Sequence, residues 1–238
     1  MAAPTYGVAG TYLENESTSQ SFPAPASVVA NSVVVLVAYV DGVADPGIGL
    51  PGGFAHAEGS PVYLGTAGGT DQNHRLVVAW HRASGSEAGP YVMTTTSTRF
   101  VNGQAHRCDG CVTSGTPFDS PTGSAGTVTS GTTSPTVSVT TAGADRLLLH
   151  AATSWAGGTW TAPGGFTKRM QAASGLVTLA DKAQATAGGS GSITATCSGS
   201  DKMQAWLGAL IPASGGGGPA VIPGRPQLYV PRRRAANW

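Results

Sequence analysis

The stretch Leu50-Pro51-Gly52-Gly53-Phe54 returns later in the chain as Ala162-Pro163-Gly164-Gly165-Phe166. Other segments repeat around it in the same order: Ser32–Ala38 with Ala144–His150, Leu76–Ala83 with Leu176–Ala183, and Gln104-Ala105 with Gln204-Ala205. Repeated pieces in a fixed order indicate an internally duplicated architecture. We therefore expect two copies of one unit, with the Pro-Gly-Gly-Phe turns at symmetric corners.

The composition favours strands over helices. The chain has 238 residues, of which 35 are glycine and only 11% are charged. Glycine costs about 1 kcal/mol relative to alanine inside a helix, whereas β-branched runs fit strands. The run Ser32–Val40 is apolar enough to predict a central strand that is buried on both faces. Short apolar runs separated by regular turn signals predict an all-β body, a β-sandwich or jelly roll with an internal pseudo-twofold repeat.

The expected body covers residues 1–213 as one domain, with repeat halves at about 5–116 and 126–213. Exposed sheet edges invite pairing, and one sandwich covers the edges of both halves better than two separate units do. The Gly/Ser/Thr/Pro-rich stretch Pro117–Gly131 is expected to link the halves. Breaks in the apolar patterns predict separate strands at Tyr91–Thr98 and Phe100–Arg107 and, in the second half, at Ser192–Cys197 and Lys202–Ile211.

Residues 214–238 differ from the body and are expected to form a Gly-rich linker and an extended basic tail. The body carries nine basic and twelve acidic residues, a net charge of −3, whereas the tail carries +4. A basic tail on an acidic body suggests attachment to an acidic surface. Arginines beside apolar and aromatic residues suit docking on another subunit; the candidate partner-binding residues are Arg225, Leu228, Tyr229, Val230, Arg232, Arg233, Arg234 and Trp238. The alternative is a solvated terminus.

The sequence disfavours two classes of partner. The body has no basic stripe with interleaved aromatic residues, so we do not expect it to bind nucleic acid. The longest apolar run, Val33–Val40, is far shorter than the roughly 20 residues that a membrane-spanning helix needs, and we expect no membrane insertion. The start Met1–Thr5 has no basic and apolar regions of a secretory signal, so we expect synthesis in a cytoplasm.

The sharpest candidate for chemistry is His106-x-Cys108-x-x-Cys111. These residue types at this spacing can share a zinc ion, and Cys197 is a candidate fourth ligand. A single Cys-x-x-Cys is incomplete as a zinc motif, so no cofactor is predicted. A disulfide, either local or through Cys197, and ordinary reduced thiols are the alternatives, and reduced thiols are favoured.

No residue set indicates catalysis. The serines do not form a Gly-x-Ser-x-Gly elbow between a strand and a helix, and no catalytic residues are assigned. Core packing is the competing interpretation for the tryptophans, and Trp80 and Trp206, in apolar strands, are expected to fill the interior. Trp155 and Trp160 flank a Gly-Gly turn and are expected to be exposed, where their rings could stack on sugars.

The chain resembles a family of β-sandwich structural proteins of tailed bacteriophages, especially phages of actinobacteria. The resemblance covers about residues 5–213 and depends on short motifs, among them Ser32–Val40, Pro51–Phe54, Arg75–Trp80, Ser86-Glu87-Ala88, Pro117-Phe118-Asp119, Asp145–Ala151, Pro163–Phe166 and Gln204–Pro212, with the closing Pro-Arg-Arg-Arg and terminal aromatic. Family members often have Gly-Trp where this chain has Gly53-Phe54 and Gly165-Phe166, and they lack the Cys-x-x-Cys.

The resemblance implies a virion component, a minor tail protein or a head decoration protein, without catalytic residues. We therefore expect a non-enzymatic protein that is made in the host cytoplasm and resides in the virion. Its expected partners are other capsid or tail subunits, including copies of itself. Two other classes remain open: an adsorption module that binds host-surface glycans, and a cell-wall hydrolase.

Overall fold

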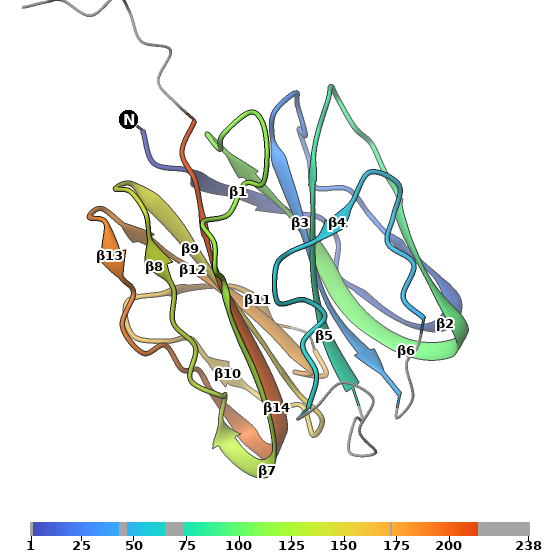
Figure 1. Ribbon diagram of the computed structural model, residues 1–238. Coiled ribbons are helices and arrows are strands. Elements are labelled where there is room, and N and C mark those ends of the chain that lie inside the picture. The colour runs from blue at the N-terminus through green and yellow to red at the C-terminus, as the bar shows by residue number, and fades with distance from the viewer. Residues whose placement is uncertain (1, 43–46, 65–73, 172, 214–238) are drawn as a thin grey trace, which may run out of the picture.

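The computed structural model describes residues 2–42, 47–64, 74–171 and 173–213. Figure 1 shows that these residues form two β-sheets packed against each other. Each sheet has six strands, all pairs are antiparallel, and no helix occurs in the described ranges. The predicted all-β, sandwich-like architecture is confirmed, while the predicted tail at 214–238 lies outside the described residues.

The first half of the chain builds the first sheet. Its strands are β1 (Thr5–Ala9), β2 (Leu13–Phe22), β3 (Val33–Asp41), β4 (Ala55–His56), β5 (His74–Arg82) and β6 (Tyr91–Asp109). The second sheet contains β7 (Gly123–Thr133), β9 (Arg146–Ser154), β10 (Trp160–Thr161), β11 (Thr167–Gln171), β12 (Val177–Gln184) and β14 (Thr196–Leu210). A separate ribbon pairs β8 (Thr140–Thr141) with β13 (Gly188–Gly189).

The two sheets share one strand topology. In the first sheet β2 pairs with β6, and the order continues β6-β3-β5-β4. In the second sheet β7 pairs with β14, and the order continues β14-β9-β12-β11. The corresponding strands also follow one another in the same order along the chain. The repeat in the sequence is therefore a repeat of strand connectivity, with one sheet for each copy.

The Pro-Gly-Gly-Phe segments form matching turns. The Phe54 N–H donates to the Pro51 carbonyl at 3.0 Å, and the Phe166 N–H donates to the Pro163 carbonyl at 2.9 Å. The glycine before each phenylalanine has φ near +80°, a left-handed conformation that favours glycine. Each turn leads directly into an edge strand, β4 or β11.

The strand pairing observed after these turns shows that the sequence alignment of β5 with β12 is wrong by one residue. Ala55 pairs with Trp80, and its counterpart Thr167 pairs with Asp181, whereas the sequence alignment matched Trp80 to Ala180. A one-residue shift moves every side chain to the other face of a sheet. The Leu-Val pair that both segments share, Leu76-Val77 and Leu176-Val177, misled the sequence alignment because both strands are apolar on both faces.

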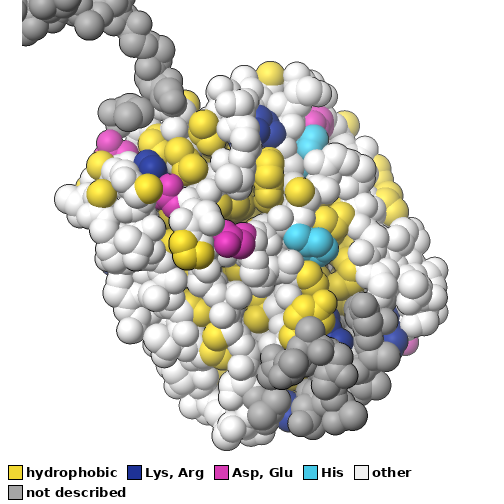
Figure 2. Space-filling model, in the orientation of Figure 1, with side chains coloured by type: hydrophobic (Ala, Val, Ile, Leu, Met, Phe, Trp, Pro, Cys, Tyr) yellow, Lys and Arg dark blue, Asp and Glu magenta, His cyan; other side chains and the backbone are white. Residues whose placement is uncertain are grey.

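The core has an inner layer between the sheets and an outer layer on each sheet. The residues Val33–Val40 are all buried, as predicted for a strand covered on both faces. Alternate β3 residues, beginning with Val33 and Val35, pack between the sheets with Leu149 and Trp206. The intervening β3 residues join a second cluster on the outer face, partly covered by Leu50 and Phe54. Charged side chains are sparse on the face that Figure 2 shows.

Two sequence predictions about strands were wrong. The expected linker Pro117–Gly131 contains β7, which pairs along β14; its Ser/Thr/Gly-rich residues lack the apolar alternation that marks a strand. The strand pairs expected at 91–107 and 192–211 are mainly the single strands β6 and β14. Irregular pairing interrupts both strands where breaks were predicted, near Arg99 and Asp201, so those breaks mark bulges within one strand.

Candidate functional site

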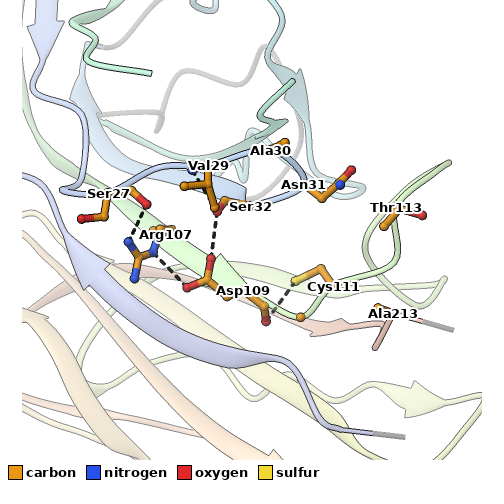
Figure 3. Close-up of a pocket in the computed structure, with 11 residues that line it drawn as sticks. Ser27, Val29, Ala30, Asn31, Ser32, Arg107, Asp109, Cys111, Thr113 and Ala213 are labelled. Atoms are coloured by element: carbon orange, nitrogen blue, oxygen red, sulfur yellow. Dashed lines mark hydrogen bonds and ion pairs between the residues drawn. The ribbon is translucent and has the colours of Figure 1, made fainter. Parts of the chain in front are cut away.

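An open cleft of about 360 Å³ lies where β6 ends and the described chain leaves β14 (Figure 3). One wall is the loop between β2 and β3, and another is the end of β6. The residues that define it include Val29, Asn31, Ser32, Arg107, Asp109 and Ala213. Segments 27–32 and 107–113, which are far apart in the sequence, thus meet Ala213 at one hollow.

Ionic and hydrogen-bonded contacts fix the polar wall of the cleft. Asp109 accepts a hydrogen bond from the Ser32 hydroxyl at 2.8 Å, and its other carboxylate oxygen lies 2.9 Å from Arg107 Nε. Arg107 Nη1 also donates to the carbonyls of Ala26 and Ser27, each at 2.7 Å. The side chain of Asp109 remains 36% exposed, so its carboxylate is both positioned and accessible.

The loop wall is strained and carries an exposed apolar side chain. Ser27 and Asn31 have φ of 58° and 68°, the left-handed region that non-glycine residues seldom occupy. Such residues cost about 1 kcal/mol or more each, and they cluster at ligand-binding sites. Between them, Val29 is 53% exposed. The loop therefore presents an apolar surface beside an accessible carboxylate.

The chain leaves the body through a hydrogen-bonded clamp beside this cleft. The Ala213 N–H donates to the Gly110 carbonyl at 2.7 Å, and the Val112 N–H donates to the Ile211 carbonyl at 2.8 Å. Ile211 in turn donates to the carbonyl of Pro117 at 2.8 Å. The exit of the second sheet is thus held by the segment that follows the first sheet.

Sequence reasoning did not identify this cleft, although strand alternation gave a partial signal. His106 and Cys108 point into the protein, so the intervening Arg107 and the following Asp109 belong to the opposite face of β6. Nothing local to the sequence indicated that the loop around Val29 would meet them.

The predicted metal ligands are buried in the structure. The His106 Nδ1 lies 3.1 Å from the Tyr6 hydroxyl, and Cys108 packs in the inner core. Cys108, Cys111 and Cys197 are free and buried, and Cys197 contacts the Gly157 carbonyl at 3.3 Å. Within the described ranges, no three His, Cys, Asp or Glu side chains are grouped as metal ligands.

Burial suppresses the reactivity of this motif. It raises the pKa of the Cys108 thiol well above its ordinary value and that of Cys111 to about 12, so both thiols are protonated near neutral pH. Burial also lowers the pKa of His106 to about 3, which keeps the imidazole neutral. Because the thiolate is the nucleophile, these cysteines are poorly placed for covalent chemistry.

The tryptophans proposed to stack on sugars have different environments. Trp155 is 41% exposed, as expected, and its ring centroid lies 6.2 Å from that of His74. Trp160 was expected to be exposed but is only 1% exposed, because its indole packs in the core and donates to the Gly175 carbonyl at 2.7 Å. The prediction of a two-tryptophan platform was therefore wrong, and Trp155 alone faces solvent.

Polar contacts that the sequence did not predict join the two copies. The Arg169 guanidinium of β11 lies 4.5 Å from the centroid of the Tyr6 ring in β1, and it also pairs with Asp181. The Trp206 indole donates across the sheets to the Glu58 carbonyl at 2.9 Å. Burial raises the pKa of Tyr6 to about 12. These contacts belong to the inter-sheet boundary and leave the cleft at Asp109 available.

Three findings complete the description of the site. The candidate tail residues Arg225 to Trp238 lie outside the described residues. Among the described residues, no helix is long and apolar enough to cross a membrane. No protein-family model, curated protein or solved structure matches the chain.

Proposed function

We propose that the chain is a non-enzymatic structural subunit of a bacteriophage particle, a minor tail protein or a head decoration protein. Its body is the duplicated β-sandwich, and its C-terminal tail attaches it to neighbouring subunits. The resemblance of the short motifs to tailed-phage structural proteins supports the phage setting, and the arrangement of the chain exit supports the attachment.

The observation that carries the proposal is the clamp at the chain exit. A load applied at residue 214 passes first to Ala213 and Ile211, which are hydrogen-bonded to the Gly110–Pro117 segment. That segment continues directly from β6, the long strand of the first sheet. Because Ile211 also follows directly from β14, force on the tail is shared between both sheets. Such a connection suits a subunit that is tethered through its C-terminus.

The separation of charge between body and tail indicates which kind of surface the tail binds. The tail carries four arginines and no acidic residue, whereas the body has an excess of acidic residues. Arginine with neighbouring aromatic and aliphatic residues is a common anchor in protein interfaces. We propose that the segment Leu228–Val230, with Arg232–Arg234 and Trp238, contacts acidic and apolar surface on other particle subunits.

The direct test is to locate the chain in particles. An antibody against the body should label particles purified from a lysate that contains this chain, as seen by immunogold electron microscopy. Recovery of the chain only in the free-protein fraction of a density gradient would overturn the proposal.

The role of the tail is tested by replacing Arg232, Arg233 and Arg234 with serine in the full chain. We expect incorporation into particles to fall at least tenfold, because several charge-assisted contacts are lost together. Replacing the same residues with lysine is the matched control and should preserve most of the incorporation, since the charge is kept. Equal incorporation of the serine variant would show that the tail is not the anchor.

Glycan binding is the second candidate, and the exposed indole of Trp155 favours it. A single exposed ring can stack on a sugar, and such stacking would bring the particle to a host surface. In a glycan array, Trp155→Ala should abolish a signal that Val92→Ala, a change at another exposed apolar side chain, leaves intact. An array without signal for the unmodified chain would remove this candidate.

A further inference from the structure

We propose that the cleft between Val29 and Asp109 binds the C-terminal tail of a second copy of this chain. This inference deepens the proposed function by naming one surface that the tail recognises. It would make the contact between copies head-to-tail, because the cleft of one chain meets the tail of another.

The chemistry of the cleft matches that of the tail. The cleft offers the exposed Val29 side chain next to the carboxylate of Asp109. In the tail, the apolar segment Leu228–Val230 is separated from Arg232 by one proline. An extended peptide with this spacing can place an aromatic or aliphatic side chain on the valine and a guanidinium at the carboxylate.

The groups that line the cleft are also held in position before a ligand binds. Figure 3 shows the loop residues and the Arg107–Asp109 pair lining the same hollow. The contacts of Asp109 to Ser32 and Arg107 hold the carboxylate in place before anything binds. A positioned group loses little conformational entropy on binding. The left-handed residues Ser27 and Asn31 keep Val29 at the rim, although a relaxed loop would be less strained.

The position of the chain exit and the length of the tail allow the tail to reach the cleft of a neighbouring copy. Ala213 itself lines the cleft, so the chain's own tail starts there. Its apolar segment begins fifteen residues further on, at Leu228. Fifteen residues can span at most about 50 Å, so the chain is long enough for this segment to reach the cleft of another copy.

Two variants of the full chain separate the halves of this contact. Val29→Arg places a positive charge in the cleft, and Tyr229→Ser removes the aromatic ring of the tail. Val92→Arg is the matched control, because Val92 is also an exposed valine but lies near the other end of β6. Thermal unfolding followed by circular dichroism should show all three variants folded like the unmodified chain, since each changed side chain is exposed or lies outside the body.

The measurement is molar mass against concentration by analytical ultracentrifugation. The unmodified chain and Val92→Arg should associate beyond dimers as concentration rises, because a head-to-tail contact leaves one free cleft and one free tail. Val29→Arg and Tyr229→Ser should each associate at least tenfold more weakly. An equimolar mixture of these two variants should restore association but stop at dimers, because Tyr229→Ser supplies the only intact cleft and Val29→Arg the only intact tail.

Each other outcome counts against the inference. Association of Val29→Arg at the level of the unmodified chain would show that the cleft is not the contact. A mixture that stays monomeric would exclude a contact in trans, and a monomeric unmodified chain at all concentrations would exclude self-assembly through this cleft. None of these results would prevent particle labelling, so a failure here is distinguishable from a failure of the proposed function.

Discussion

The two Pro-Gly-Gly-Phe corners have the same backbone but different side-chain support. In the first copy, Phe54 stacks on His81 at 5.2 Å, and His81 contacts both the Gly53 carbonyl at 3.1 Å and the Glu87 carboxylate at 2.8 Å. Tyr91 donates to the other oxygen of Glu87 at 2.9 Å. In the second copy, Lys182 takes the position of His81, with its ammonium 5.8 Å from the Phe166 ring centroid, and the His150 ring lies edge-on to Phe166 at 6.3 Å.

Some features of the duplicated unit are the same in both copies, and others differ. Turn geometry, strand order and the apolar inner layer recur in both copies because they determine whether a sheet forms and packs. Polar support depends on one or two side chains, so it can differ between copies without changing the fold. The cleft at Asp109 lies at the end of β6, beside Ala213.

Buried histidines give the largest expected difference between the copies. His74 and His106 belong to the first sheet and His150 to the second, and all three are fully buried. Burial lowers the pKa of His74 and His106 to about 3 and that of His150 to about 4; for His74 the charges of Arg75 and Lys202 add to the effect. The unfolded chain therefore takes up protons at higher pH than the folded protein does.

It follows that stability is complete above about pH 6.5 and falls as the pH is lowered toward 4. Each histidine contributes roughly 1 kcal/mol of loss per pH unit, so the three together remove roughly 5–8 kcal/mol over two units. Urea unfolding at pH 6.5, 5.5 and 4.5 measures this slope. The double variant His74→Phe/His106→Phe should remove about two thirds of the histidine contribution, and His150→Phe about one third. A slope unchanged in both variants would show that these residues do not set the acid sensitivity.

The next largest effect tests whether the two copies unfold together. Trp206 of the second sheet is fully buried, packs edge-on against Phe118 at 5.3 Å and donates to Glu58 in the first copy. Trp206→Ala should cost about 3–5 kcal/mol and shift a single urea transition, followed by circular dichroism. The control Trp155→Ala removes an exposed ring and should cost about 0.5 kcal/mol. Two separate transitions, of which only one shifts, would mean that the copies unfold independently.

Strands that are buried on both faces were predicted from the sequence more accurately than the exposed edge strand was. The apolar run Ser32–Val40 predicted β3 to within one residue at each end, because nearly every residue of a strand covered on both faces is apolar. The strand β7 was missed because an edge strand of serine, threonine and glycine has no apolar face. The cleft was missed for another reason: it joins Val29 to Asp109 across the fold, and the left-handed residues of its loop are not glycines. Such long-range contacts leave no local pattern.

The smallest expected effect concerns the side chains that contact the phenylalanine at each of the two Pro-Gly-Gly-Phe corners. His81→Phe keeps a ring against Phe54 but loses the contacts to Gly53 and Glu87, so it should cost about 2 kcal/mol. Lys182→Met keeps the aliphatic stem over Phe166 and loses only an outward-facing cation–π contact, a loss of about 0.5 kcal/mol. Urea unfolding at pH 7.5 measures both. Equal costs would mean that the turn backbone, common to both copies, supplies nearly all of the stability at the corner and that the polar network of the first copy is incidental to the fold.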